Sequence, residues 1–427
     1  MRFFIQTLGC PKNEADSDRL ERALQAAGLI RGRSDDADVV VVNTCGFIDA
    51  AKEESIGAIL DAAAAAHARG ARVAAVGCLV ERYHPELEAE VPEVDLWCGL
   101  EWGALTAALV ADGTRPAAGG AGEGGRRAPR RPRSTHAYIK VSDGCDRRCA
   151  YCAIPLIKGA YEATPPAAIL ADAAAALANG ARELVLVGQD TSRWSWPGWG
   201  GLERLLAELK ALGPVWVRLL YLQPDGIDGA LLEAVAAHAV PYLDVPLQHA
   251  SGVVLRRMGR GGDGDAYLEL LERARRALPG VAVRSTFITG FPGETEEDVE
   301  RLLEFIAAAR LAVAGVFVFD AQEGTRAAAL PGQVPTELRL ERAARLGEAI
   351  DAAAEGFWAG LAGRELDVLV ERGSGRPDGE AVGRLAVQAP DIDGRTLLSG
   401  HPVRRGRLVR ARVVGMLGYD VAATTGD

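Results

Sequence analysis

The sequence predicts an α/β protein of three parts: an N-terminal doubly wound α/β domain, a partial (βα)6 barrel and a small C-terminal antiparallel β-barrel. Strand-like runs alternate with helical patterns up to about residue 358, and this alternation is typical of parallel sheets. After residue 360 the chain changes to short alternating runs separated by Gly, Pro and Asp, which predict about five short strands.

A length of 427 residues agrees with about three domains, at roughly 150 residues for each. We expect these domains at 1–111, 134–358 and 360–427. Residues 112–133 are rich in Gly, Pro and Arg and have no hydrophobic periodicity, so they predict a flexible linker.

The N-terminal domain contains three strand-like runs, each followed by a helical pattern. The runs are FFIQTL (3–8), DVVVVN (38–43) and RVAAVG (72–77). One cysteine follows each of them: Cys10, Cys45 and Cys78. Because the carboxyl ends of parallel strands lie along one edge, we expect the three thiols to converge there. The alternative is that they are small buried apolar residues at strand ends. Cys98 follows a further short apolar run, and we treat it as a bystander.

The middle segment alternates six strand-like runs with helical stretches and ends in a long helical pattern over 336–358. The runs cover 137–142, 183–188, 216–222, 242–247, 283–289 and 315–320. Six such units predict an open barrel of parallel strands, with its chemistry on the loops at the carboxyl ends.

The loop after the first of these strands carries Cys145, Cys149 and Cys152 with the spacing Cys-x3-Cys-x2-Cys. Three thiolates on one tight loop suit a cubane iron–sulfur cluster, which leaves the fourth iron without a protein ligand. A structural zinc site would need a fourth Cys or His nearby. His136 lies at the far end of the strand and is badly placed for that role.

This spacing resembles the signature of the radical S-adenosylmethionine (SAM) superfamily. The resemblance implies a 4Fe-4S cluster whose open iron binds SAM, and reductive cleavage of SAM to a 5′-deoxyadenosyl radical. It also implies a set of SAM-contacting residues. These are Tyr151, Gly188, Gln189, Ile288, Gly290 and Glu294. From the residues alone, the stretch GFPGE (290–294) is equally consistent with a turn followed by a helix start.

The whole chain resembles the radical SAM methylthiotransferases, which have an N-terminal domain with a second 4Fe-4S cluster, a radical SAM core and a C-terminal TRAM domain. Several stretches are similar to the branch that modifies a ribosomal protein, the RimO branch. They are LGCPKNEADS (8–17), VNTCGFID (42–49), VGQDTS (187–192), VPLQHAS (245–251) and RSTFITGFPGET (284–295). The tRNA-modifying MiaB branch tends to have GCQMN in place of the first stretch.

The resemblance implies addition of a methylthio group to the β-carbon of one aspartate in the twelfth protein of the small ribosomal subunit. It assigns radical generation to the cluster of the middle segment and sulfur delivery to the cluster of Cys10, Cys45 and Cys78. Both clusters would face one cavity, since the radical carbon must meet its sulfur at contact distance. The implied partners are the ribosomal protein, bound through the TRAM domain, an electron donor and a sulfur donor.

Two other functions stay open. A tRNA adenosine methylthiotransferase would share every cofactor residue, although the acidic excess in residues 1–111 would repel an RNA backbone. A metal-binding or electron-carrying protein without enzymatic activity would need fully ligated metals. The arginine run in residues 404–412 is either a solvated strand edge or a partner site.

Composition narrows the remaining classes. The net charge of −10 argues against a protein that holds nucleic acid mainly by a basic surface. No apolar run approaches the ~18 residues of a membrane helix, and the N-terminus has no signal-peptide pattern. We therefore expect a cytoplasmic protein without membrane association, in which cysteines serve as metal ligands or reactive thiols.

Overall fold

The structure is a computed structural model that describes residues 1–113, 134–374 and 379–426. Its contacts divide the described chain into two units. The first unit contains residues 1–113 together with Gly144–Asp146 and Ala153–Tyr161, and the second contains the remaining described residues. The predicted linker, 112–133, lies outside the described residues from residue 114 onwards.

The first unit is built on a five-stranded sheet in which every pair is parallel, in the order β2-β1-β3-β4-β5. The strands are β1 (Arg2–Thr7), β2 (Ile30–Arg31), β3 (Val39–Thr44), β4 (Arg72–Gly77) and β5 (Leu96–Cys98). The sequence predicted β1, β3 and β4 to within one residue at each end. It missed β2 and β5 as strands, because two or three residues are too few to show a periodic pattern.

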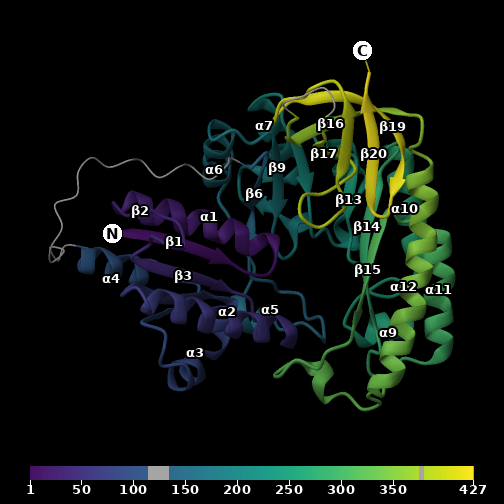
Figure 1. Ribbon diagram of the computed structural model, residues 1–427. Helices are drawn as coiled ribbons and strands as arrows, with labels where there is room; N and C mark the ends of the chain where they lie inside the picture. The colour runs from purple at the N-terminus through teal and green to yellow at the C-terminus, as the bar shows by residue number, and fades with distance from the viewer. Residues whose placement is uncertain (114–133, 375–378, 427) are drawn as a thin grey trace. The chain divides into compact units, whose positions relative to one another are not determined.

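Helices cover both faces of this sheet, which confirms the doubly wound architecture (Figure 1). They are α1 (Pro11–Ala26), α2 (Asp49–His67), α3 (Cys78–Glu90) and α4 (Gly103–Gly113). Helices α1 and α4 pack on the face that carries Val39 and Val41, whereas α2 packs on the face that carries Val40 and Val42. Successive residues of β3 therefore serve opposite hydrophobic cores, as the period of a strand requires.

The core of the second unit contains the six predicted strands as two three-stranded parallel sheets, ordered β12-β9-β6 and β13-β14-β15. They are β6 (His136–Lys140), β9 (Glu183–Val187), β12 (Trp216–Leu219), β13 (Tyr242–Asp244), β14 (Ala282–Thr289) and β15 (Val313–Val318). Two antiparallel pairs accompany them: β7 (Ser142–Asp143) with β8 (Glu162–Ala163), and β10 (Ser195–Trp196) with β11 (Gly200–Gly201).

Helices follow these strands along the chain. They are α5 (Ile154–Lys158, in the first unit), α6 (Pro166–Ala178), α7 (Leu202–Ala211), α8 (Gly229–His238), α9 (Gly252–Arg257), α10 (Gly264–Ala277), α11 (Glu296–Ala309) and α12 (Thr336–Ala359), with short 3-10 turns at Thr191–Arg193, Pro224–Gly226 and Arg326–Ala329. The long predicted helix over 336–358 is thus confirmed as α12. Among the described residues, every helix is too short or too polar to cross a membrane.

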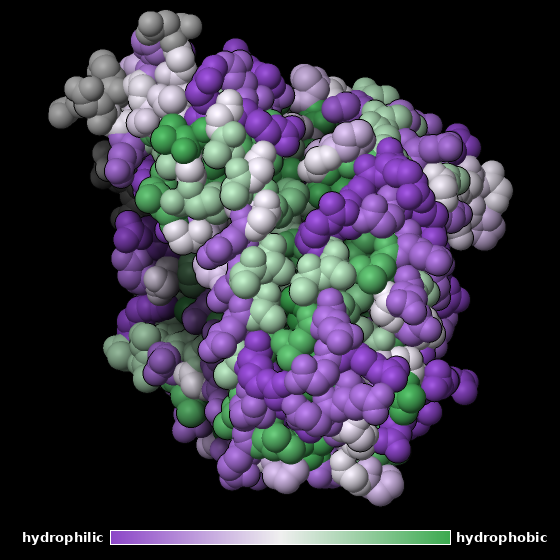
Figure 2. Space-filling view, turned by 90° about the vertical axis from the view of Figure 1, so that its right-hand side faces the viewer, coloured by the Kyte–Doolittle hydropathy of each residue, from purple (hydrophilic) through white to green (hydrophobic). Residues whose placement is uncertain are grey.

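Helices α11 and α12 lie side by side on one face of the second unit. Arg345 of α12 forms ion pairs with Glu296 and Glu300 of α11. Figure 2 shows this side of the molecule, where hydrophilic surface is interrupted by smaller apolar areas. A capping box between Thr295 and Asp298 starts α11, so the acidic run after residue 294 is a helix start, as one reading of the sequence predicted.

The C-terminal module is a closed five-stranded barrel in the order β16-β17-β18-β20-β19. Its strands are β16 (Glu365–Arg372), β17 (Ala381–Leu385), β18 (Thr396–Gly400), β19 (Leu408–Leu417) and β20 (Asp420–Thr425). The pairs are antiparallel as predicted, except that β18 and β20 are parallel. The arginine run lies partly in β19, where residues 408–411 pair with β16 alone and pairing with β20 begins at Arg412. Its five arginines are exposed, as the reading of a solvated strand edge expects. Arg410 and Arg412 form ion pairs with Asp367 and Glu365 of β16.

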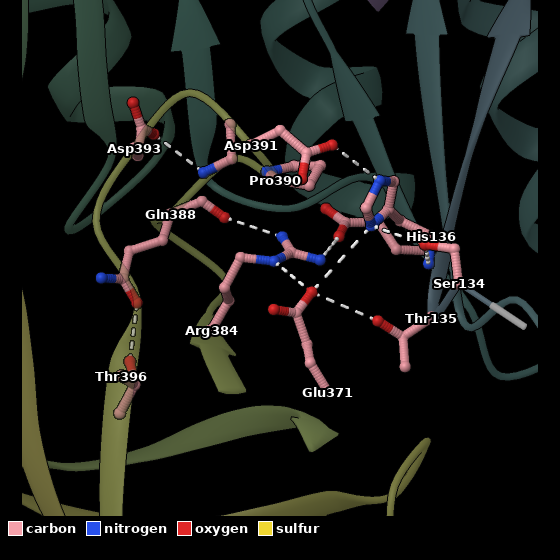
Figure 3. A network of polar contacts seen from close by, with 12 residues as sticks. Ser134, Thr135, His136, Glu371, Arg384, Gln388, Pro390, Asp391, Asp393 and Thr396 are labelled. Atoms are coloured by element: carbon pink, nitrogen blue, oxygen red, sulfur yellow. Dashed lines mark hydrogen bonds and ion pairs between the residues drawn. The ribbon is translucent and has the colours of Figure 1, made fainter. Parts of the chain in front are cut away.

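A network of polar contacts joins this barrel to the amino ends of the core strands (Figure 3). Arg384 of β17 pairs with Glu183 of β9 and with Glu371 of β16. At the rim of the network, the imidazole of His136 lies 3.1 Å from the carboxylate of Asp391. The carboxyl ends of the core strands, where we expect the chemistry, are at the other end of the strands.

Candidate active site

The three N-terminal cysteines follow three adjacent strands of the first unit, as the sequence predicted. Cys10 is the N-cap residue of α1, Cys45 follows β3, and Cys78 is the first residue of α3. The sheet order changes direction between β1 and β3, and ligands of doubly wound sheets bind at such a switch point. The order of the strands therefore brings Cys10, Cys45 and Cys78 to one edge of the sheet, as the sequence predicted.

The pKa values of Cys45 and Cys78 are shifted, and the neighbouring cysteines contribute to both shifts. Burial, the nearby Cys10 and Cys45 thiols and the carboxylate of Asp16 raise the pKa of Cys78 to about 12, and only the positive charge of Lys158 opposes them. Burial also raises the pKa of Cys45, with a smaller contribution from Cys10. Metal binding at these positions would therefore have to displace thiol protons, and the N-termini of α1 and α3 would favour the resulting thiolates.

Asn13 holds together the loops that carry two of these cysteines. Its side-chain amide donates to the carbonyl of Leu8 at 2.9 Å and to the carbonyl of Thr44 at 3.0 Å. Next to it, Gly9 has a φ of +86°, and a Cβ there would lie 2.7 Å from the Cβ of Cys45. The stretch LGCPKN thus brings two strand ends together through a close backbone approach that only glycine permits.

Three thiols form a donor set of the kind that holds an iron–sulfur cluster. Within the residues that the structure describes, no three His, Cys, Asp or Glu side chains meet closely enough to hold one metal ion. Thiolates that bind separate irons of a cluster need not meet at one point. Cys98 ends the neighbouring strand β5, where its thiol donates to the carbonyl of Glu101 at 2.9 Å.

The second set, Cys145, Cys149 and Cys152, lies in the loop between β7 and α5. The division into units passes through this loop, because Cys145 belongs to the first unit and the other two cysteines to the second. The backbone N–H of Cys145 donates to the carbonyl of Gly159 within the first unit. Within the second unit, that of Cys152 donates to the carbonyl of Cys149.

Arg147 fastens this loop to the carboxyl ends of the neighbouring strands. Its Nε donates to Asp190, after β9, at 2.6 Å, and its two terminal nitrogens donate to Asp225, after β12, at 2.9 and 3.0 Å. Although burial opposes the charge of Arg147, the two carboxylates raise its pKa, so it remains a cation. The function of Asp190 as an anchor for this loop depends on its contact with Arg147.

The other end of the loop is held by backbone contacts. Ala150 donates to the carbonyl of Met258 at 2.7 Å and accepts from the N–H of Ala327 at 2.8 Å. Arg260 brings a guanidinium nitrogen to 3.9 Å from the sulfur of Cys149. Cys149 also lines a cavity of about 590 Å³ together with Arg147, Arg148, Arg260, Tyr267 and Arg273.

Four buried polar atoms near the carboxyl ends of β6, β9 and β12 have no hydrogen-bond partner among the described residues. They are Ser142 Oγ, Gln189 Nε2, Thr191 Oγ1 and Gln223 Oε1. Buried polar groups are rarely left unpaired, so several from adjacent strands indicate a place for a polar ligand. A Cβ on Gly188 would lie 2.4 Å from the hydroxyl of Ser142, so glycine permits the close approach of these two strand ends. Of these positions, the sequence had singled out only Gly188 and Gln189.

The remaining predicted SAM contacts lie on or near the same end of the core. Tyr151 and Ile288 are partly buried and pack against the large hydrophobic core. Burial is the main cause that raises the pKa of the Tyr151 hydroxyl, which stays neutral. Gly290 directly follows β14 and has a φ of +74°. Contact of these residues with SAM stays a prediction.

Protein groups contact both carboxylate oxygens of Glu294. One oxygen lies 3.2 Å from Nε2 of His249, and the other accepts from the N–H of Gly290 and from Arg342, both at 2.8 Å. Nδ1 of His249 accepts two backbone N–H groups, which assigns the ring proton to Nε2. Glu294 therefore shapes the turn after β14, and its direct contact with SAM stays a prediction.

Family comparisons divide the chain as its architecture does. Residues 2–99 match Uncharacterized protein family UPF0004, residues 139–306 match the Radical SAM superfamily and residues 362–425 match the TRAM domain. Among solved structures, the radical SAM methyltransferase TsrM from Kitasatospora setae is similar with a TM-score of 0.55 at 16% identity, over 74% of each chain. That likeness concerns the fold alone.

Curated relatives match nearly the full length. Two proteins named ribosomal protein uS12 methylthiotransferase RimO are similar: that of Desulforudis audaxviator is 41% identical over 99% of this chain and 96% of its own. That of Moorella thermoacetica is 42% identical over 97% of this chain and 96% of its own. Because these matches cover nearly the full length at about 40% identity, this chain belongs to the RimO family of radical SAM methylthiotransferases.

Proposed function

We propose that this protein adds a methylthio group to the β-carbon of an aspartate in ribosomal protein uS12. The observation that carries the proposal is the identity of about 40%, over almost the whole chain, to relatives named for that substrate. When bound, two 4Fe-4S clusters and SAM would supply hydrogen-atom abstraction from an unactivated carbon together with the sulfur and methyl group that replace the hydrogen.

Cys145, Cys149 and Cys152 would hold the cluster used with SAM. Arg147 would keep their loop in place through Asp190 and Asp225. The four unpaired polar atoms after β6, β9 and β12 would bind polar groups of SAM, which agrees with the predicted contacts at Gly188 and Gln189. Tyr151, Ile288 and Gly290 would complete the pocket, and Glu294 would act by holding Gly290 in its turn.

Cys10, Cys45 and Cys78 would hold a second cluster, with one iron free to take the sulfur that is transferred. The donor set is favourable because all three groups are thiols, and two of them lie at helix N-termini. A sulfur donor and an electron donor are then required as partners, and the C-terminal TRAM domain would bind the protein substrate. We place the reaction in the cytoplasm, where ribosomes are.

The test separates this function from the tRNA-modifying alternative. Reconstituted full-length enzyme with SAM, sulfide and a reductant is incubated with uS12 and, separately, with tRNA. Mass spectrometry should show the mass of a methylthio group on one aspartate of uS12 and an unmodified tRNA. Modification of tRNA instead of uS12 would assign the protein to the other branch.

Cysteine variants separate the enzyme from a protein that only stores metal or electrons. Cys10→Ala should abolish methylthiolation yet leave reductive SAM cleavage, because the second cysteine set is untouched. Cys149→Ala should abolish both activities. Cys98→Ala is the matched control and should retain both. Bound zinc without SAM cleavage in the parent protein would contradict an enzymatic function.

A further inference from the structure

Lys158 brings a buried positive charge to the N-terminal cysteines. It is the last residue of α5, the helix that begins two residues after Cys152. Its Nζ lies 3.2 Å from the carboxylate of Asp16 on α1, and only 2% and 5% of these two side chains are exposed. A buried lysine is costly in free energy, so its position beside these three thiols calls for a function.

The packing of α5 fixes where this charge lies. Ala153, the N-cap residue of α5, and Ile157 within the helix form a small hydrophobic cluster with Cys78, and Leu100 packs against it. The charge of Lys158 acts on the Cys78 thiol in the direction that favours the thiolate, whereas the carboxylate of Asp16 acts in the opposite direction. The ammonium group and the carboxylate are thus two opposite charges beside one cysteine.

We propose that Lys158 is a positioning residue that sets the reduction potential of the N-terminal cluster and holds the anionic sulfur on its open iron. The inference rests on the proposed function, because it requires that cluster. A 4Fe-4S cluster with three thiolates is anionic, and a bound sulfide makes it more negative. A nearby buried cation stabilises the added charge in both cases, because the low dielectric of the interior strengthens the attraction.

Asp16 keeps the lysine in this position. In Asp16→Asn the amide oxygen would still accept from the ammonium group, so the variant removes the negative charge and keeps the lysine in place. Removal of Lys158 and removal of Asp16 should therefore shift the reduction potential of the cluster in opposite directions. Loss of a purely structural salt bridge would not produce opposite shifts. Removal of the positive charge should make the cluster harder to reduce, and removal of the negative charge should make it easier to reduce.

The experiment uses the full chain with Cys145→Ala, Cys149→Ala and Cys152→Ala, so that only the N-terminal cluster remains. After anaerobic reconstitution, its reduction potential is measured by a titration followed by electron paramagnetic resonance, and its sulfide affinity by titration with sodium sulfide. Lys158→Met should lower the potential and weaken sulfide binding about tenfold. Lys158→Arg should stay near the parent, and Asp16→Asn should raise the potential.

Two further variants define the outcome. The double variant Lys158→Met with Asp16→Asn should have a reduction potential below that of the parent but above that of Lys158→Met alone. A purely structural salt bridge predicts that the potential of the double variant returns to the parent value. Lys52→Met is the control, since it removes a cation of the same unit that pairs with Asp49 on α2. Equal potentials in all variants overturn this inference alone. Failure of the parent to bind iron overturns the proposed function as well.

Discussion

Arg384, on β17 of the C-terminal barrel, donates a hydrogen bond to the fully buried carboxylate of Glu183 at the start of β9. Arg218 of β12, itself fully buried, donates to the other carboxylate oxygen at 2.7 Å. One carboxylate therefore joins the barrel, β9 and β12 through charge-assisted bonds between buried side chains. The active-site end of β9 carries Gln189 and Asp190, so this network holds the opposite end of the same strand.

Replacement of Glu183 by Gln should destabilise the second unit strongly. Two buried guanidinium groups would lose their shared counter-charge, and breaking such a pair costs about 3–5 kcal/mol. Chemical denaturation followed by far-UV circular dichroism measures the loss. Glu297→Gln, which removes an exposed carboxylate paired with Arg301 on α11, should cost less than about 1 kcal/mol. A similar small loss for both variants would contradict the importance of the buried network.

The carboxylate of Glu183 should also make the stability of the folded protein sensitive to acid. Burial would raise the pKa of Glu183, but Arg384 and Arg218 outweigh it and hold the value at about 2, below the ordinary 4.5. The unfolded chain then binds a proton more readily than the folded chain. The contribution is fully present above pH 4.5 and falls as the pH approaches 2, by an amount on the order of 3 kcal/mol. Glu183→Gln should show a flatter acid limb in a series of denaturation curves.

We expect Asn13 to support binding of the proposed N-terminal cluster, although it is not one of the proposed ligands. Asn13→Ala would leave the carbonyls of Leu8 and Thr44 without their donor, and an unpaired buried group costs about 1–3 kcal/mol. Because these carbonyls flank Cys10 and Cys45, iron bound in a chain that lacks the other cysteine set should decrease. Asn179→Ala, at the exposed end of α6, should leave the iron content unchanged.

Arg147 should support iron binding by Cys145, Cys149 and Cys152, as Asn13 supports it at the N-terminal cysteines. Arg147→Met removes the three hydrogen bonds that tie the loop to Asp190 and Asp225. In a chain with Cys10, Cys45 and Cys78 replaced, iron content and the rate of reductive SAM cleavage should both fall, the latter by about tenfold or more. Arg148→Met, a neutralised neighbour with an exposed side chain, is the control. Equal rates in both variants would show that the loop needs no anchor.

These positions show how far the sequence could predict the site. Cys10, Cys45 and Cys78 could be grouped because each follows a parallel strand, and strand order alone brings such residues to one edge. Asn13 and Lys158 could not be identified, since their importance depends on contacts with distant backbone and side chains. Glu294 shows the same limit: a motif singles out the residue, but its four protein partners become evident only in the folded chain.

Most strands of the fold could be predicted from the sequence, but some strands and one pairing could not. Six strands of the core and three of the N-terminal sheet have clear hydrophobic runs, whereas β2 and β5 are strands only because a neighbour pairs with them. The parallel pair β18–β20 depends on how the barrel closes, which no local pattern encodes.

Substitution of Thr191 tests the proposed SAM site, because it should weaken SAM binding without lowering the stability of the protein. Its side chain is fully buried and its hydroxyl has no partner in the described part of the chain. Thr191→Val keeps the shape and removes the hydroxyl, so the folded protein loses an unsatisfied polar group and its stability should be unchanged or higher. If the hydroxyl binds SAM, the dissociation constant measured by calorimetry should rise about three- to tenfold.

Thr289→Val provides the contrast, because the equally buried hydroxyl of Thr289 lies 3.2 Å from the carboxylate of Glu294. That substitution removes a satisfied bond and should cost about 1 kcal/mol of stability. A residue kept for a ligand gains stability when its polar group is removed, whereas a residue kept for the fold loses it. Loss of stability in Thr191→Val with unchanged SAM affinity would therefore remove Thr191 from the site and leave Ser142, Gln189 and Gln223 as its polar groups.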